Sequence, residues 1–142
     1  MKIRLGDLRK IIREAMTVGS RLAPSGVPGA GLGVFSTGDV GAGEEVFSWD
    51  PQVDSEYSGE YLDGLSPEES EEFQDLASWD GEVWSLAGDN GAYFNHSEDP
   101  NVEVVPRGGV RPARWARVAA RDIRPGEEMT MDYSQVGSDV PR

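Results

Sequence analysis

The chain of 142 residues contains no cysteine and a single histidine, His96. The absence of cysteine excludes disulfide bonds, cysteine-ligated zinc and thiol catalysis. With one histidine, any metal site would have to be built from carboxylates, and the stretch SEDPN behind His96 lacks the acidic spacing of a calcium loop. We therefore expect no metal site.

Long apolar runs are also missing. No run approaches the roughly 18 residues of a membrane span, and hydrophobic residues make up 37% of the chain. Near the N-terminus, charges at Arg9, Lys10, Arg13 and Glu14 interrupt the apolar region that a signal peptide would need. We expect a cytoplasmic protein with one domain and no membrane association.

Basic side chains are absent from residues 22–106, which carry 19 of the 26 acidic residues. The net charge of the chain is -13. A surface of negative potential repels nucleic acid phosphate and attracts basic partners, although an acidic composition also serves solubility alone. We expect a basic protein partner and no direct binding of nucleic acid.

The first 18 residues predict a basic amphipathic helix, because Leu5, Leu8, Ile12 and Ala15 are spaced by three and four. Residues 17–31 contain prolines and glycines that cannot sustain a helix, so they indicate a linker. The helix is therefore predicted as an appendage, which could dock the protein onto a larger assembly.

Residues 19–142 predict a β-rich α+β domain. One helix is expected over residues 66–79, where Ser66 can cap the N-terminus and Pro67 suits the first turn. The expected strands are short runs separated by glycine and proline: LGVFS, EEVFSW, NVEVVP, ARWARVAA and EMTMDY.

Two segments of the chain repeat a pattern. DVGAGEEV at residues 39–46 and DIRPGEEM at residues 122–129 share Asp, an aliphatic residue, Gly-Glu-Glu and an apolar residue. Each predicts a turn whose glycine, Gly43 or Gly126, has a positive φ. The repeat suggests a fold with two similar corners, though eight positions also fit two unrelated turns of one type.

Common catalytic patterns do not fit. In GAGLGVF, residues 29–35, the sixth position is Val34 and a strand follows, which excludes a dinucleotide-binding loop. A Ser-His-Asp hydrolase would depend on His96, and no GxSxG motif is present. What remains is a glycine-rich backbone that a ligand can approach closely, or a plain loop.

Three segments together resemble the signatures of the SET domain family of protein lysine methyltransferases. They are GAGLGVFSTGDVGAGEEV, YFNHSEDPN and ARDIRPGEEMTMDY, in the family's order and spacing, and the resemblance covers roughly residues 20–133. The size is similar to that of compact single-domain SET proteins of viruses and bacteria. The resemblance implies small antiparallel sheets around a pseudoknot, with the helix over residues 66–79 inserted.

The resemblance also implies an S-adenosylmethionine site on one face. The backbone of Gly31, Leu32 and Gly33 would hold the methionine end of this cofactor together with the side-chain amide of Asn95. The main chain of His96 would meet the adenine edge.

On the opposite face the resemblance implies a narrow channel for a lysine of a protein substrate. Tyr133 would be the catalytic residue at its inner mouth and would also contact the cofactor, with Tyr93, Phe94 and Met131 along the channel. Methyl transfer to an amine needs alignment and a dry channel more than a protein nucleophile, so one histidine is no obstacle.

Several positions depart from the family pattern. Met131 stands where many relatives carry Phe or Tyr, and a second channel tyrosine is not fixed, with Tyr57 and Tyr61 as candidates. The short stretch after Tyr133 implies that the N-terminal segment or a second subunit completes the site, or that the fold serves as a non-catalytic interaction module.

Overall fold

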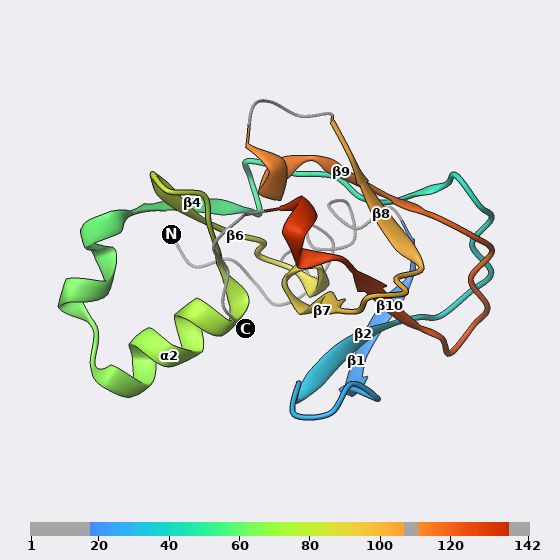
Figure 1. The fold of residues 1–142 in the computed structure, drawn as a ribbon, viewed down its shortest axis with the longest axis horizontal. Coiled ribbons are helices and arrows are strands. Elements are labelled where there is room, and N and C mark those ends of the chain that lie inside the picture. The colour runs from blue at the N-terminus through green and yellow to red at the C-terminus, as the bar shows by residue number, and fades with distance from the viewer. Residues whose placement is uncertain (1–17, 107–110, 137–142) are drawn as a thin grey trace.

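The computed structural model describes residues 18–106 and 111–136 (Figure 1). The helix predicted over residues 1–18 lies outside the described residues except for Val18, which packs against the core. The described part of the chain forms three small sheets and short helices, and two of the sheets enclose the hydrophobic core, as predicted for a SET-type β-rich fold. No helix in this part is long and apolar enough to cross a membrane.

The first sheet carries the segments that the sequence assigns to the site. Its order is β1 (Ser20–Pro24), β2 (Leu32–Ser36), β10 (Glu128–Met131) and β7 (Asn95–His96). β2 is antiparallel to both of its neighbours, whereas β7 runs parallel to β10. The glycine-rich, Asn-His and Tyr133 segments therefore meet in one sheet, and their threading as a pseudoknot stays a prediction.

The other two sheets have three strands each. The second sheet packs against the core, and the third forms a separate hairpin unit next to the helix (Figure 1). In order across each sheet, the strands are β3 (Glu45–Phe47), β9 (Ala116–Ala119) and β8 (Val102–Val105), then β4 (Ser55–Ser58), β6 (Val83–Leu86) and β5 (Ser78–Trp79).

Helix α2 (Pro67–Leu76) begins where the sequence predicts and ends earlier. Ser66 and Glu69 form a reciprocal capping box, with hydrogen bonds of 3.1 and 3.0 Å between each side chain and the other's backbone amide. The predicted helix continued to residue 79, but the backbone of Ala77 is extended and Trp79 pairs with Trp84 of β6. The cross-strand indole contact, with centroids 5.2 Å apart, outweighs continuation of the helix.

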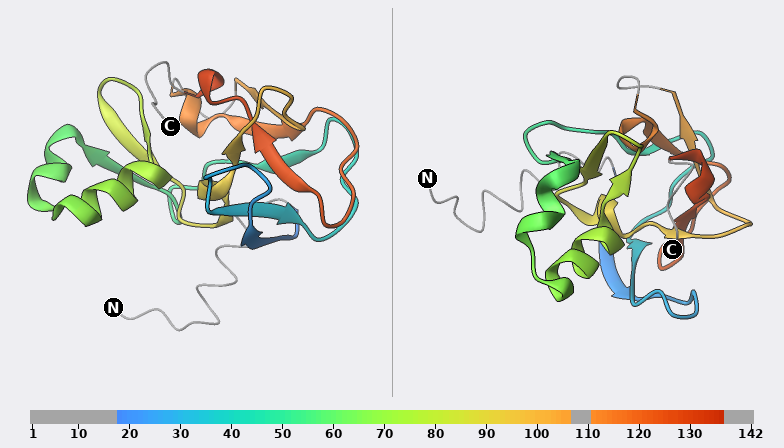
Figure 2. Two further views of the ribbon diagram at one scale, coloured as in Figure 1. Left: turned by 60° about the horizontal axis from the view of Figure 1, so that its bottom comes forward. Right: turned by 60° about the vertical axis from the view of Figure 1, so that its left-hand side comes forward.

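The described residues also form four short 3₁₀ helices: η1 (Gly59–Gly64), η2 (Asn90–Tyr93), η3 (Pro112–Arg114) and η4 (Tyr133–Gln135). Helix α2 and η1 lie together at one side of the molecule, away from the sheet that holds β1 and β2 (Figure 2). η2 and η4 flank the Asn-His strand β7 in the middle of the fold (Figure 1).

The two repeated corners face each other. Val40 and Ile123 exchange a pair of backbone hydrogen bonds, each 2.8 Å long, and Gly43 and Gly126 both have a φ of +86°. The predicted positive φ at both glycines is confirmed. This pairing joins the outer ends of the first two sheets around the buried side chains of Val34, Val46, Phe47, Val102, Ile123 and Met129.

Candidate active site

Asn95 connects the glycine-rich loop to β10. Its side-chain amide donates to the carbonyl oxygen of Leu32 at 2.9 Å and to Oε2 of Glu128 at 3.1 Å. A Cβ at Gly33 would displace the Glu128 carboxylate and lie 3.1 Å from Asn95 Nδ2, so the absence of a side chain lets both groups approach the backbone here. Gly31 adds a left-handed turn with a φ of +74°. The structure thus brings together the four residues predicted for the methionine end of the cofactor.

Glu128 is a member of this site that the sequence did not single out. Its carboxylate accepts hydrogen bonds from Ser25 Oγ at 2.6 Å and from the amide of Gly26 at 2.9 Å, besides the one from Asn95. One carboxylate therefore holds the β1–β2 loop against β7. In the sequence Glu128 is the second of two adjacent glutamates, and nothing in that pattern distinguishes it from an exposed charge.

His96 positions its neighbours through its side chain. Its Nδ1 accepts a hydrogen bond from the backbone amide of Tyr133 at 3.1 Å, which requires an Nδ1 without a proton, and the two rings lie 5.4 Å apart between centroids. The resemblance gave a role only to the main chain of His96. The structure shows that the imidazole also fixes the start of η4.

The other support of η4 is Asp132. Its Oδ1 accepts from the amide of Ser134 at 2.9 Å and from its hydroxyl at 2.8 Å, and these bonds hold the pKa of Asp132 below its ordinary value. Asp132 Oδ1 lies 3.9 Å from His96 Nδ1. His96 and Asp132 together therefore fix the backbone around Tyr133.

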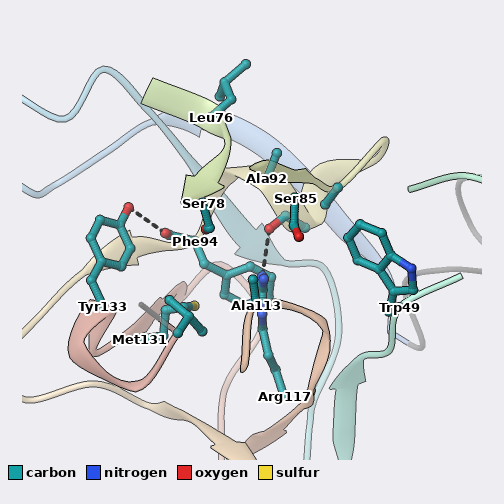
Figure 3. Close-up of a pocket in the computed structure, with 13 residues that line it drawn as sticks. Trp49, Leu76, Ser78, Ser85, Ala92, Phe94, Ala113, Arg117, Met131 and Tyr133 are labelled. Carbon is teal, nitrogen blue, oxygen red and sulfur yellow. Dashed lines mark hydrogen bonds between the residues drawn. The ribbon is translucent and has the colours of Figure 1, made fainter. Parts of the chain in front are cut away.

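The hydroxyl of Tyr133 points to the wall of a pocket (Figure 3). It donates to the carbonyl oxygen of Phe94 at 2.8 Å. Of the three residues predicted for the substrate channel, Phe94 and Met131 line this pocket, whereas Tyr93 is not among its lining residues and packs against the core. The pocket is lined by Trp49, Leu76, Ser78, Ser85, Ala87, Gly91, Ala92, Phe94, Ala113, Arg117, Met131, Tyr133 and Val136.

The two tyrosines proposed for the second channel position lie elsewhere. Tyr57 and Tyr61 stack on each other with centroids 4.4 Å apart, and both contact Phe73 of α2 at 5.1 and 5.0 Å. They join helix α2 to β4 and do not line the pocket. Trp49 supplies an aromatic wall of the pocket, and the cation of Arg114 lies 4.8 Å from its ring.

Arg117 is a buried cation behind the pocket. Its guanidinium lies 4.3 Å from the ring of Phe47 and 4.8 Å from that of Phe94, and Nη1 donates to the carbonyl of Gly91 at 2.7 Å. Burial lowers the pKa of Arg117 to about 10, so the group remains charged at neutral pH. Two carboxylates balance this charge, those of Asp54 and Asp89.

Both balancing carboxylates are themselves buried. Burial raises the pKa of Asp89 to about 6 and also raises that of Asp54. Asp89 accepts the amide of Gly91 at 2.8 Å, and Asp54 accepts the amides of Asp50 and Gly88 at 2.7 and 2.8 Å. Sequence patterns gave no sign of this cluster, since its members lie on separate elements.

The chemistry of these residues suits an amino-acid ligand better than a metal. No group of three or more His, Asp or Glu side chains that could hold a metal ion occurs within residues 18–106 and 111–136. The Glu128 carboxylate and the close backbone approach at Gly33 can accommodate a cationic, amino-acid-like group. These features fit the methionine end of S-adenosylmethionine.

Comparison with known proteins agrees with this arrangement. The SET domain family matches residues 31–134. The histone-lysine N-methyltransferase SETMAR of Mus musculus is 44% identical over 48 residues, which are 33% of this chain and 16% of the mouse protein. The match thus spans about a sixth of that relative's length. The protein of Rattus norvegicus with the same name gives the same identity over 48 residues.

Solved structures share the fold. The Neurospora SET domain protein DIM-5, a histone lysine methyltransferase, superposes with a TM-score of 0.55 at 19% identity, covering 94% of this chain and 58% of that one. The Chaetomium thermophilum Polycomb Repressive Complex 2, in an autoinhibited conformation bound to S-adenosylmethionine, gives a TM-score of 0.60 at 21% identity over 87% of this chain and 16% of that one. The class defined by fold and site is that of SET-type proteins, and the chain belongs to the SET domain family.

Proposed function

We propose that the protein is an S-adenosylmethionine-dependent methyltransferase that acts on lysine side chains of proteins. One observation carries the proposal: the neighbouring residues Phe94 and Asn95 contact the two halves of the site. The Phe94 carbonyl accepts a hydrogen bond from the Tyr133 hydroxyl at the pocket, and the Asn95 amide donates to the carbonyl of Leu32 in the glycine-rich segment and to Glu128 of β10. A methyl donor on one side and an amine on the other would thus meet beside Tyr133.

On the cofactor side, Gly31, Leu32, Gly33, Asn95 and the main chain of His96 would hold S-adenosylmethionine. When bound, this cofactor supplies an electrophilic methyl group on a sulfonium. Asn95 and the backbone of Leu32 and Gly33 would orient the amino-acid end of the cofactor. The Glu128 carboxylate holds the β1–β2 loop in place through Ser25 and Gly26, beside the residues that would bind the cofactor.

On the pocket side, the residues prepare an amine for attack. The reference pKa of a lysine is about 10.4, but burial beside positive charge disfavours the ammonium form, so the proton leaves to water. The aromatic walls of the pocket would bury the amine, and the sulfonium of the bound cofactor would supply the positive charge. The Tyr133 hydroxyl and the Phe94 carbonyl are the polar groups that would orient the neutral nitrogen.

The charge distribution supports a basic protein as substrate. Helix α2, whose Leu76 lines the pocket, contains acidic side chains and no basic one. Residues 22–106 as a whole carry 19 acidic residues. Negative potential there would attract a lysine-bearing basic segment and repel nucleic acid. We infer that the protein acts on a basic intracellular protein.

The test is transfer of label from S-adenosylmethionine to basic polypeptides such as histones, with Tyr133→Phe as the matched control. The proposal predicts label on lysine for the wild type, loss of label for the variant, and thermal stabilisation of both proteins by the cofactor. Absence of both transfer and stabilisation would instead support a non-catalytic interaction module with the same fold.

A further inference from the structure

Asp89 and Arg117 each keep one buried polar atom unpaired. Oδ1 of Asp89 accepts a hydrogen bond from the amide of Gly91 at 2.8 Å, and Nη1 of Arg117 donates to the carbonyl oxygen of Gly91 at 2.7 Å. Oδ2 of Asp89 and Nε of Arg117 are also buried, but neither has a hydrogen-bond partner among the described residues. A buried polar group without a partner typically costs about 1–3 kcal/mol, so two of them side by side require an explanation.

The two unpaired atoms are complementary. The Nε–H of an arginine can only donate, and an oxygen of an ionised carboxylate can only accept. Asp89 and Arg117 attract each other electrostatically, and both are hydrogen-bonded to Gly91. One water molecule between them can accept from Nε and donate to Oδ2, which satisfies both atoms.

This pair lies at the wall of the pocket. Arg117 and Gly91 are lining residues, and Figure 3 shows the guanidinium of Arg117 hydrogen-bonded at that wall. A Cβ at Gly91 would lie 2.8 Å from Oδ1 of Asp89, so the absence of a side chain brings the carboxylate close to the lining. The pocket offers water a volume of about 30 Å³, and one water molecule needs roughly 10–15 Å³.

The second carboxylate of the cluster is paired differently. Asp54 accepts the amide of Asp50 through Oδ2 at 2.7 Å and the amide of Gly88 through Oδ1 at 2.8 Å. Both of its oxygens are therefore engaged by the backbone. Of the two carboxylates that balance Arg117, Asp89 is the one with a buried oxygen left for water.

We propose that Asp89 is the proton acceptor for the substrate amine, and that a water held between Asp89 Oδ2 and Arg117 Nε carries the proton from the pocket. This inference rests on the proposed function, to which it adds the destination of the proton. Burial raises the pKa of Asp89 to about 6, so the group is ionised at neutral pH. A general base is most effective when its pKa lies near the working pH. The charged groups that face Asp89 are Asp54, which raises its pKa, and Arg117, which lowers it.

The step balances without any further reagent. One N–H bond of the lysine ammonium breaks, and its electron pair stays on nitrogen. The proton goes to the water, which passes one of its own protons to Oδ2 of Asp89. The neutral amine then forms its bond to the methyl carbon while the bond from that carbon to sulfur breaks, with the electron pair left on sulfur. The product leaves as a methylated ammonium, and Asp89 returns its proton to solvent.

The first experiment measures kcat/KM for methyl transfer to a lysine-rich basic polypeptide between pH 5 and 9. For the wild type we expect a plateau at neutral pH and a fall below about pH 6, where Asp89 takes up a proton. Asp89→Asn should be about 100-fold slower at pH 7, the lower end of what general base catalysis contributes. Its kcat/KM should then rise about tenfold per pH unit up to pH 9, because the fraction of neutral lysine in solution rises by that factor.

Asp54→Asn is the matched control, since it removes a buried carboxylate of the same cluster that has no oxygen left for the water. Its profile should keep the plateau from pH 7 to 9. Its acid limb should move to lower pH, because the charge of Asp54 contributes to the raised pKa of Asp89. A deficit of Asp89→Asn that is the same at every pH would show that Asp89 only supports the pocket wall, and it would overturn this proposal while the proposed function stands. If the wild type transfers no methyl group, both fail.

A second experiment needs neither cofactor nor substrate. In a high-resolution crystal structure of the full chain, we expect an ordered water within about 3 Å of both Oδ2 of Asp89 and Nε of Arg117. A direct hydrogen bond between these two atoms would leave no place for the water and would overturn the relay.

Discussion

The hydroxyl of Tyr133 donates a hydrogen bond of 2.8 Å to the carbonyl oxygen of Phe94, one residue before the asparagine that holds the glycine-rich loop. The backbone of the Tyr133 residue is fixed independently, by His96 Nδ1 and by the Asp132 cap. These contacts place the phenol oxygen between the pocket and the glycine-rich segment. The backbone contacts at Tyr133 do not involve that oxygen, so they remain if it is removed.

Replacement of Tyr133 by Phe should therefore separate catalysis from folding. Loss of a preorganised donor typically lowers kcat by about 100-fold or more. Loss of one hydrogen bond should lower the free energy of unfolding by only about 1 kcal/mol. Steady-state methyl transfer and urea unfolding measure the two effects. Activity within a few-fold of the wild type would show that the hydroxyl has no part in the reaction.

Arg117 links the pocket wall to the core, and its replacement by Met should destabilise the protein. The guanidinium stacks between Phe47 and Phe94 and balances Asp54 and Asp89, and its residue is only 6% exposed. Removal of one partner from a buried charge cluster costs about 3–5 kcal/mol, because the remaining charges are left uncompensated.

The measurement is the free energy of unfolding in urea at pH 7. Arg117→Lys is the informative control, since it keeps the charge but loses the planar stacking and the hydrogen-bond geometry to Gly91. It should fall between the wild type and Arg117→Met. A Met variant as stable as the wild type would show that the charge cluster contributes nothing to stability.

Asp89 should make stability depend on pH. Burial raises its pKa to about 6, above the value of about 3.9 in the unfolded chain. Between pH 4 and 6 the folded state therefore binds more protons than the unfolded state, and stability falls as pH rises through this range. The total contribution is on the order of 3 kcal/mol at most, since Asp54, whose pKa is also raised, interacts with Asp89 in the same cluster.

The comparison that isolates this effect is wild type against Asp89→Asn, each unfolded in urea at pH 4, 5, 6 and 7. The difference between their free energies of unfolding should change in favour of the Asn variant as pH rises from 4 to 6, then level off. Carboxyl groups with a lowered pKa, such as that of Asp132, contribute equally to the free energies of unfolding of both proteins, so their contribution cancels in the difference. A difference that is constant with pH would contradict the assignment.

Features set by local sequence could be predicted well. The positive φ of Gly43 and Gly126 and the capping of α2 by Ser66 follow from residues within one turn of the chain. The meeting of Asn95 with Leu32 and Gly33 could be predicted only from the family pattern, since 63 positions separate Asn95 from Leu32.

Features set by distant partners could not be predicted. Glu128 meets Ser25 across 103 positions, and Arg117 meets Gly91 across 26. Neither residue type nor spacing distinguishes these two side chains from the exposed charges around them. The early end of α2 has the same origin, because Trp79 is drawn into the sheet by Trp84 rather than by its own neighbours.

Glu128 gives the last prediction, which concerns cofactor binding. Its two carboxylate oxygens accept from Ser25, Gly26 and Asn95, whereas a glutamine could accept through only one oxygen and would place an NH₂ group against the other donors. Glu128→Gln should therefore loosen the β1–β2 loop and misplace Asn95. Hydrogen bonds to a charged group contribute about 1.5–3 kcal/mol each, so affinity should fall by about 10-fold or more.

Isothermal titration calorimetry with S-adenosylmethionine and with S-adenosylhomocysteine measures this effect directly. Both ligands should lose affinity to a similar degree, because they share the amino-acid end that the loop would hold. Glu103→Gln is the matched control, an exposed glutamate on β8 outside both the loop and the pocket, and it should bind like the wild type. Unchanged affinity in Glu128→Gln would mean that the carboxylate organises the empty loop without contributing to the bound state.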